Sequence, residues 1–186
     1  ILLKIKISIM NKLHFKNHKW VILVFTVFGL IFASLSFVNH YNFRTYGWDL
    51  GINQNAIFDY AHLRWNDCMI MQPSFKNVLA DHFSLYPLII SPLYWIFGSY
   101  TMLIFQWAAI LFGGLGVFRF VDFISKNKNL ATLAVVHFFC IWGIYSALSF
   151  DYHDNVVGAM FVPWFLYYYK KKDLGKAVLF FILLLI

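Results

Sequence analysis

Glutamate is absent from this sequence, and charged residues of any kind are scarce. Only 12% of the 186 residues are charged, which is about half the share found in ordinary soluble domains. Long apolar runs recur along the whole chain instead, and 61% of the residues are hydrophobic. This composition excludes a large soluble domain. It predicts an all-α, polytopic transmembrane helical bundle that forms a single membrane domain over residues 1–186.

Several familiar functional motifs are also missing. The sequence has no Walker motif, no Rossmann fingerprint and no Ser-His-Asp order. Gly113, Gly114 and Gly116 follow no predicted strand, so we expect them to allow close helix packing rather than to bind phosphate. The net charge of +7 does not predict nucleic-acid binding, because the basic residues stand in short clusters between apolar runs. That pattern is typical of membrane orientation.

The apolar runs define the expected spans. The first covers residues 20–38, which as a helix is about 28 Å long and close to the thickness of the bilayer core. Residues 39–98 form an outer loop, with an interfacial helix over 50–65 and a short apolar segment over 84–98. Further spans occupy 100–186, at 100–121, 129–149 and 150–169, followed by an apolar run over 177–186. That run is too short to cross, so we expect a fragment truncated at its C-terminus.

The basic residues decide whether the segment 84–98 crosses the membrane. If it does not cross, twelve of the fifteen Lys and Arg lie on the cytoplasmic side, and only Arg44, Arg64 and Lys76 lie outside. If it does cross, most basic residues move outside, against the positive-inside rule. The sequence therefore predicts a re-entrant or interfacial helix at 84–98, a cytoplasmic N-terminus and a multi-pass protein of the cytoplasmic (inner) membrane of the cell envelope.

This topology collects acids and histidines on the outer face. Asp49 precedes the interfacial helix, Asp81 and His82 precede the segment 84–98, and Asp151, His153 and Asp154 begin the predicted helix 150–169. Charged groups near membrane depth tend to be functional. Simpler interpretations stay open: Asp49 as a helix N-cap, Asp81 and His82 as a polar pair at a helix start, and 151–154 as a solvated loop. Asp and His also suit a divalent cation, although the spacing matches no strict metal signature.

Short motifs along the chain resemble a known family. They are Trp48-Asp49-Leu50-Gly51-Ile52 with Gln54, then His82-Phe83-Ser84, Pro92-Leu93-Tyr94, Gln106 and Asp151-Tyr152-His153-Asp154. In this order they resemble the membrane proteins grouped as domain of unknown function 2079, over about residues 20–175. That family is in turn similar to the GT-C glycosyltransferases. The family usually has an acid near position 53, where this chain has Asn53.

The resemblance implies a function. GT-C enzymes pass a sugar from a polyprenyl-phosphate donor to an acceptor on the non-cytoplasmic face, using an acid of the first outer loop as base. It implies an inverting, GT-C-type glycosyltransferase, with Asp49 as the catalytic base and with Asp81, His82, Asp151, His153 and Asp154 as substrate-binding residues. The expected partners are membrane lipid, the lipid-linked donor and an acceptor, with no nucleic acid. A membrane transporter and a non-catalytic assembly subunit are the alternatives.

Overall fold

The computed structural model describes residues 19–68, 77–80 and 83–186. Every regular element in this described part is helical, which confirms the predicted all-α membrane fold. The elements, in chain order, are α2 (Lys19–Tyr41), α3 (Asp49–Ala61), η2 (Val78–Ala80), α4 (Tyr86–Ile90), η3 (Ser91–Leu93), α5 (Tyr94–Phe97), η4 (Gly98–Tyr100), α6 (Thr101–Ser125), α7 (Lys128–Phe139), α8 (Trp142–Phe150), α9 (Asp154–Ala159), α10 (Val162–Lys170) and α11 (Leu174–Leu185).

Two helical stretches of the described chain, Lys19–Tyr41 and Tyr86–Ser125, are long and apolar enough to cross a membrane. A third candidate is the pair α7 and α8, which is bent by 46° at its break. Within the second stretch, α6 alone has 25 residues, or about 37 Å of helix, more than the bilayer core requires. Helix α2 includes the predicted first span.

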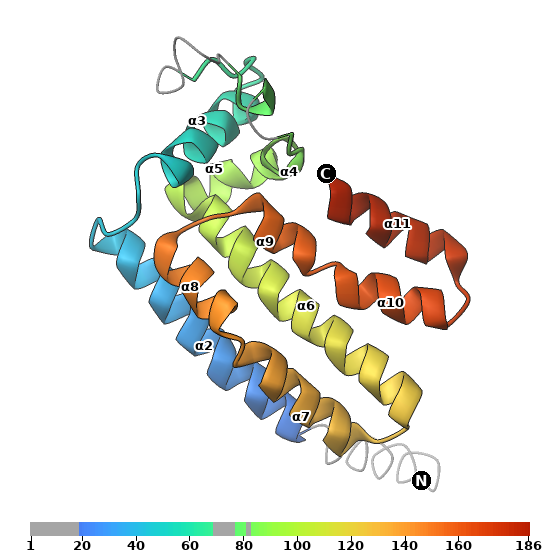
Figure 1. Ribbon diagram of the computed structural model, residues 1–186. Coiled ribbons are helices and arrows are strands. Elements are labelled where there is room, and N and C mark those ends of the chain that lie inside the picture. The colour runs from blue at the N-terminus through green and yellow to red at the C-terminus, as the bar shows by residue number, and fades with distance from the viewer. Residues whose placement is uncertain (1–18, 69–76, 81–82) are drawn as a thin grey trace, which may run out of the picture.

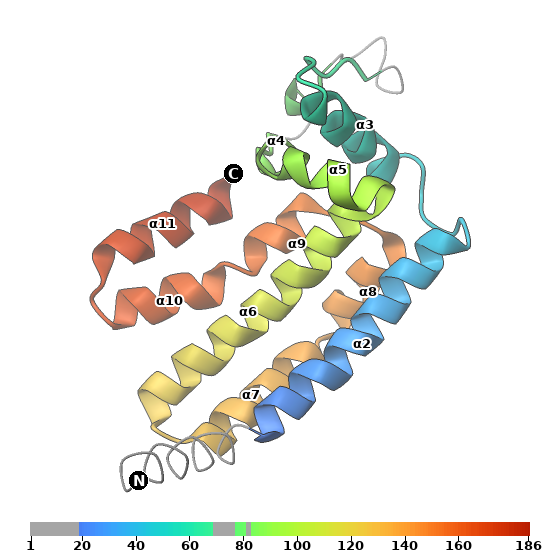
Figure 2. The ribbon, with the colours of Figure 1, turned by 180° about the vertical axis from the view of Figure 1, so that it is seen from behind.

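The helices form a bundle whose two ends carry different elements (Figure 1). The start of α2, the α6–α7 turn and the α10–α11 turn lie toward one end, and α3, α4 and α5 lie toward the other. The reverse view in Figure 2 shows α4 and α5 running across the top of α6 rather than along its axis. Gly98 makes this change of direction, because its φ of 54° and ψ of −132° suit glycine and few other residues.

Close packing around α6 forms the main core. A Cβ added at Gly113 would lie 2.8 Å from Met160 Sδ, and one at Gly116 would lie 2.9 Å from Trp164. A Cβ at Gly114 would overlap the ring of the fully buried Phe139. These glycines therefore let α7 and α9–α10 approach α6 closely, which confirms the predicted role of the three glycines.

The predicted helix 150–169 is wrong. Phe150 ends α8, residues 151–153 form a loop, and the rest is divided into α9 and α10. Pro163 occupies the first turn of α10, where its missing N–H costs nothing, whereas inside a continuous helix it would remove a backbone hydrogen bond. The predicted span 129–149 is also divided, into α7 and α8. Asp151 and His153 consequently stand in a loop and not in the first turn of a helix.

Candidate functional site

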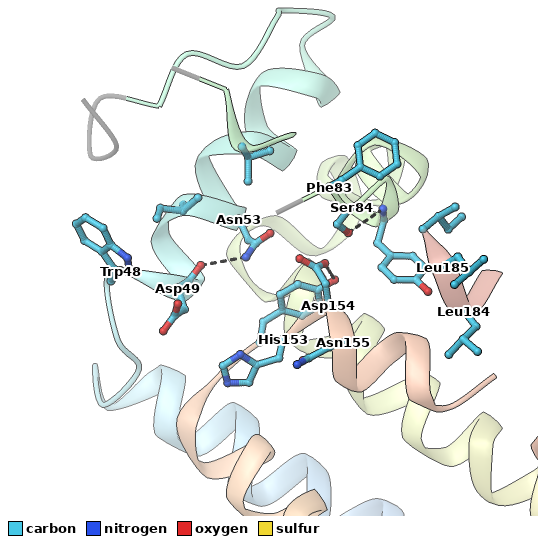
Figure 3. Close-up of a pocket in the computed structure, with 15 residues that line it drawn as sticks. Trp48, Asp49, Asn53, Phe83, Ser84, His153, Asp154, Asn155, Leu184 and Leu185 are labelled. Carbon is cyan, nitrogen blue, oxygen red and sulfur yellow. Dashed lines mark hydrogen bonds between the residues drawn. The ribbon is translucent and has the colours of Figure 1, made fainter. Parts of the chain in front are cut away.

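A cavity of about 630 Å³ lies between α3 and the start of α9 (Figure 3). Its lining residues come from α3, the start of α4, the segment 152–155 and the end of α11. The residues that line it are Trp48, Asp49, Ile52, Asn53, Val78, Phe83, Ser84, Tyr86, Tyr152, His153, Asp154, Asn155, Leu184, Leu185 and Ile186. Three residues predicted for the site, Asp49, His153 and Asp154, are thereby brought to one cavity from segments about 100 residues apart.

Asp49 belongs to the wall formed by α3. It is the first residue of the helix and is half-buried, while Trp48 occupies the N-cap position. No side chain makes a capping hydrogen bond at this end, so the N-cap interpretation of Asp49 is wrong. Leu50, the next residue of the helix, packs into the main core. The Asp49 carboxylate thus remains available to the cavity, at the helix end where negative charge is favoured.

Asn53 lies one turn further along α3 and also lines the cavity. Its Nδ2 donates to the backbone oxygen of Asp49 at 3.1 Å. Its Oδ1 is buried and has no hydrogen-bond partner among the described residues. A buried amide oxygen without a partner is costly, and a hydroxyl of a bound ligand would satisfy it. In Figure 3 this oxygen points away from Asp49, toward the side of the cavity where Asp154 and Ser84 lie.

The opposite wall is the loop 151–155, and a single amide from α6 holds it. Gln106 is fully buried. Its Nε2 donates to the backbone oxygen of Asp151 at 2.6 Å, and its Oε1 accepts from the backbone N–H of His153 at 2.7 Å. Both polar atoms of Gln106 are therefore used to fix one short loop. The partner of Gln106 is thus loop backbone.

Asp151 is the most unusual group in this wall. Its side chain is fully buried, and neither carboxyl oxygen has a hydrogen-bond partner among the described residues. Desolvation by burial raises the pKa of Asp151 to about 6, and the nearby charge of Asp49 raises it further, against the opposing effects of His153 and of the Tyr46 and Leu50 backbone amides. His153 Nε2 lies 3.9 Å from Asp151 Oδ1.

His153 and Asp154 face the cavity with different partners. His153 is one-third exposed and its ring stacks on Phe150, with centroids 5.2 Å apart. Tyr46, just before α3, stacks on the same Phe150 at 4.4 Å. Asp154 accepts a hydrogen bond of 2.6 Å from the hydroxyl of the fully buried Tyr152. The pKa of that hydroxyl is raised well above its ordinary value by burial and by the charge of Asp154, so Tyr152 stays a donor.

Two predicted site residues, Asp81 and His82, lie outside the described residues. Phe83 and Ser84, which follow them, do line the cavity. Among the residues that the structure describes, no group of three or more His, Cys, Asp or Glu could hold a metal ion. The described cavity lining contains two carboxylates and one imidazole, with no Lys or Arg.

Sequence reasoning did not select Asn53, Tyr152 or Asn155, although all three line the cavity. Asn53 carried a signal, because it stands where the resembled family usually has an acid. Tyr152 lies between two selected residues, but nothing in the sequence predicts that its hydroxyl turns toward Asp154. The two hydrogen bonds by which Gln106 holds the loop, here called the Gln106 clamp, could not be derived from its position in an apolar run.

A family model described as "Predicted membrane protein (DUF2079)" matches residues 39–186. The match therefore includes both walls of the cavity and all of α3 to α11. No curated protein and no solved structure matches the chain significantly.

Proposed function

The chain belongs to the DUF2079 family of predicted membrane proteins, and within that family we propose that it is an integral membrane glycosyltransferase-like protein. It moves a sugar from a polyprenyl-phosphate donor to an acceptor on the non-cytoplasmic face. The observation that carries this proposal is the cavity of about 630 Å³ that Asp49 on α3 lines together with His153 and Asp154. That volume is within the ordinary range for a small-molecule site.

The proposed reaction is an inverting displacement, and it uses Asp49 as a general base. The acceptor hydroxyl oxygen attacks the anomeric carbon of the donor sugar and loses its proton to the Asp49 carboxylate. The bond between the anomeric carbon and the phosphate oxygen breaks, and the lipid phosphate leaves with the electron pair. Asp49 suits this role because it is half-buried at the cavity wall and makes no capping bond.

Substrate binding is assigned to the opposite wall and to the segment before α4. His153 offers a ring N–H to the donor phosphate, and Asp154 accepts from sugar or acceptor hydroxyls while Tyr152 holds one of its oxygens. Asp81 and His82 keep their proposed roles in substrate binding on sequence grounds. The unpaired Oδ1 of Asn53 adds an acceptor for a ligand hydroxyl.

The proposed location is the cytoplasmic (inner) membrane, with the N-terminus in the cytoplasm and the cavity outside. Lys126 and Lys128 flank the α6–α7 turn, and Lys171 and Lys172 stand in the α10–α11 turn. Both turns lie toward the end of the bundle opposite α3 (Figure 1). Basic residues gathered at one end support this orientation.

Cysteine labelling in intact cells tests the orientation. The exposed Cys140 and the buried Cys68 are first replaced by serine. A cysteine at position 46, in the exposed turn before α3, should react with an impermeant maleimide. A cysteine replacing Lys126 or Lys128 should react only after the membrane is opened. Labelling of Lys126→Cys from outside would reverse the proposed topology.

Activity of the full-length protein in liposomes tests the function. The protein is supplied with a panel of polyprenyl-phosphate sugars and candidate acceptors, and transfer is followed by release of the polyprenyl phosphate. We expect one donor to be consumed by wild type, and to be consumed far more slowly by Asp49→Asn. Movement of an intact solute across the bilayer, without cleavage of any donor, would favour the transporter alternative.

A further inference from the structure

The charge of the cavity poses a problem for any phosphate ligand. Its described lining holds Asp49 and Asp154 but no Lys or Arg, and Asp151 lies directly behind His153. A phosphate brings further negative charge into a partly enclosed space, where like charges repel more strongly than in water. Within the described lining, His153 is the side chain that can carry positive charge toward such a ligand.

The geometry of Asp151 indicates where a proton is held. Both of its oxygens are buried and without hydrogen-bond partners among the described residues. An ionised carboxylate in such a place loses its hydration, and the backbone amides of Leu50 and Tyr46 compensate this loss only in part. It therefore tends to take up a proton instead. The Gln106 clamp prevents the loop from turning the side chain out to water, because it fixes the backbone on both sides of Tyr152.

His153 connects this buried carboxyl with the cavity. Its Nε2 is 3.9 Å from Asp151 Oδ1, and its ring is one-third exposed at the cavity wall. The groups that act electrically on Asp151 are His153 on its own loop and Asp49 at the start of α3, while α6 contributes only the neutral Gln106. His153 is thus the side chain that lies between the buried carboxyl of Asp151 and a ligand in the cavity.

We propose that Asp151 and His153 form a proton-holding pair, and that binding of a phosphate in the cavity is coupled to uptake of a proton by this pair. The proton comes from solvent, and no bond to the ligand is made or broken in this step. The inference rests on the proposed function for its choice of ligand. It assigns to Asp151 the role of a positioning residue that lies beside His153 and does not touch the donor.

Infrared spectroscopy of the full-length protein in lipid tests the pair without any substrate. A protonated carboxyl gives a carbonyl band that vanishes on ionisation. We expect a band that is present at pH 5, is lost as the pH rises through about 6, and is missing in Asp151→Asn. Loss of the whole band near the ordinary aspartate pKa of about 3.9 would overturn the proposal.

Two further variants keep Asp151 in place, so the test survives if Asp151→Asn folds poorly. Asp49→Asn removes a like charge and should move the loss of the band to lower pH. His153→Gln removes the cationic neighbour and should move it to higher pH. A band that is unmoved in both variants would show that the carboxyl observed is not Asp151.

Binding of farnesyl phosphate, measured at pH 5.5 and pH 8 with a chelator present, tests the coupling. The ligand phosphate itself titrates near pH 6, so the ratio of the two affinities is compared between wild type and His153→Gln. The ratio is the affinity at pH 5.5 divided by the affinity at pH 8. We expect it to be about tenfold larger in wild type than in His153→Gln, which corresponds to a phosphate-induced change of one pH unit in the pKa of the pair. Equal ratios overturn the coupling. If the transfer assay fails but the two ratios differ, the glycosyltransferase function is rejected and the proposed proton-holding pair is retained.

Discussion

The two walls of the cavity are held by different means. The α3 wall rests partly on a small, separate hydrophobic cluster of Ile52, Ala56, Tyr60, Cys68 and Val78. The 151–155 wall is tied by Gln106 directly to the main core around α6. The cavity therefore lies where two cores meet. Helix α3, which carries the proposed base, also contributes Leu50 and Ile57 to the main core.

A second polar clamp fastens the α3 wall. The fully buried Asn66 donates to Asn55 Oδ1 at 2.8 Å and to Asp59 Oδ2 at 3.2 Å. Its Oδ1 accepts from the backbone N–H of Val78 at 3.0 Å. Thus each wall depends on one buried amide side chain, but Asn66 joins segments near in sequence, whereas Gln106 joins segments about 45 residues apart.

The largest expected effect distinguishes the two walls by their proposed roles, which are proton transfer for the α3 wall and donor binding for the 151–155 wall. Asp49→Asn keeps the shape of the side chain and removes the basic oxygen, so transfer should fall by about 10²–10⁴-fold while donor affinity is retained. His153→Ala should show the reverse, with weakened donor binding as the primary defect. Single-turnover rates and donor affinities of the reconstituted full-length protein measure both. Near-normal turnover in Asp49→Asn would move the base to another carboxylate.

The next effect concerns stability in the 151–155 wall. Because burial raises the pKa of Asp151 from 3.8 to about 6, the folded protein binds this proton more tightly than the unfolded chain does. The resulting stabilisation is complete below pH 3.8 and is lost as the pH rises through about 6. The stability of wild type relative to Asp151→Asn should fall by roughly 3 kcal/mol between pH 3 and pH 7. Unfolding in detergent at several pH values measures this, and a constant difference would contradict it.

Removing the Gln106 clamp should have a smaller but still large effect on stability. Gln106→Leu leaves the Asp151 carbonyl and the His153 N–H buried without partners, at a cost of about 2 kcal/mol or more. The matched control is Gln54→Leu, because Gln54 also bonds a backbone oxygen, that of Ser99, but at an exposed site. Thermal unfolding of both variants gives the comparison. Equal losses would mean that the clamp is no more important than a surface bond.

The smallest effect is expected in the α3 wall. Asn66→Ala should cost about 1–2 kcal/mol, because the N–H of Val78 loses its partner. The infrared titration of Asp151 should be unchanged, since Asn66 belongs to the other core. Asn127→Ala, which removes the exposed cap of α7, is a control at the far end of the bundle, with a comparable cost of about 1 kcal/mol. A shifted Asp151 titration in Asn66→Ala would show that the two walls are not independent.

The sequence predicted the helical class and the grouping of Asp49, His153 and Asp154, because apolar runs and their basic flanks are set by the bilayer. It did not predict the division of residues 150–169. The break between α9 and α10 lies just before Pro163, within an apolar run, where hydropathy does not detect it. The burial of Asp151 also could not be foreseen. It depends on Gln106, whose hydrogen bonds reach across 45 positions of the chain, and no local pattern records such a contact.

The ring of Phe150 links the two walls of the cavity at one edge. Tyr46 leads into α3 and His153 stands on the other wall, yet both stack on this one side chain. The cavity cannot widen at that edge unless one of the two stacks separates. A substrate too large for the existing gap would have to break an aromatic contact, whereas one that fits leaves both intact. Phe150 is not among the lining residues, yet through its contact with His153 it connects the proposed phosphate site to the segment that leads into α3.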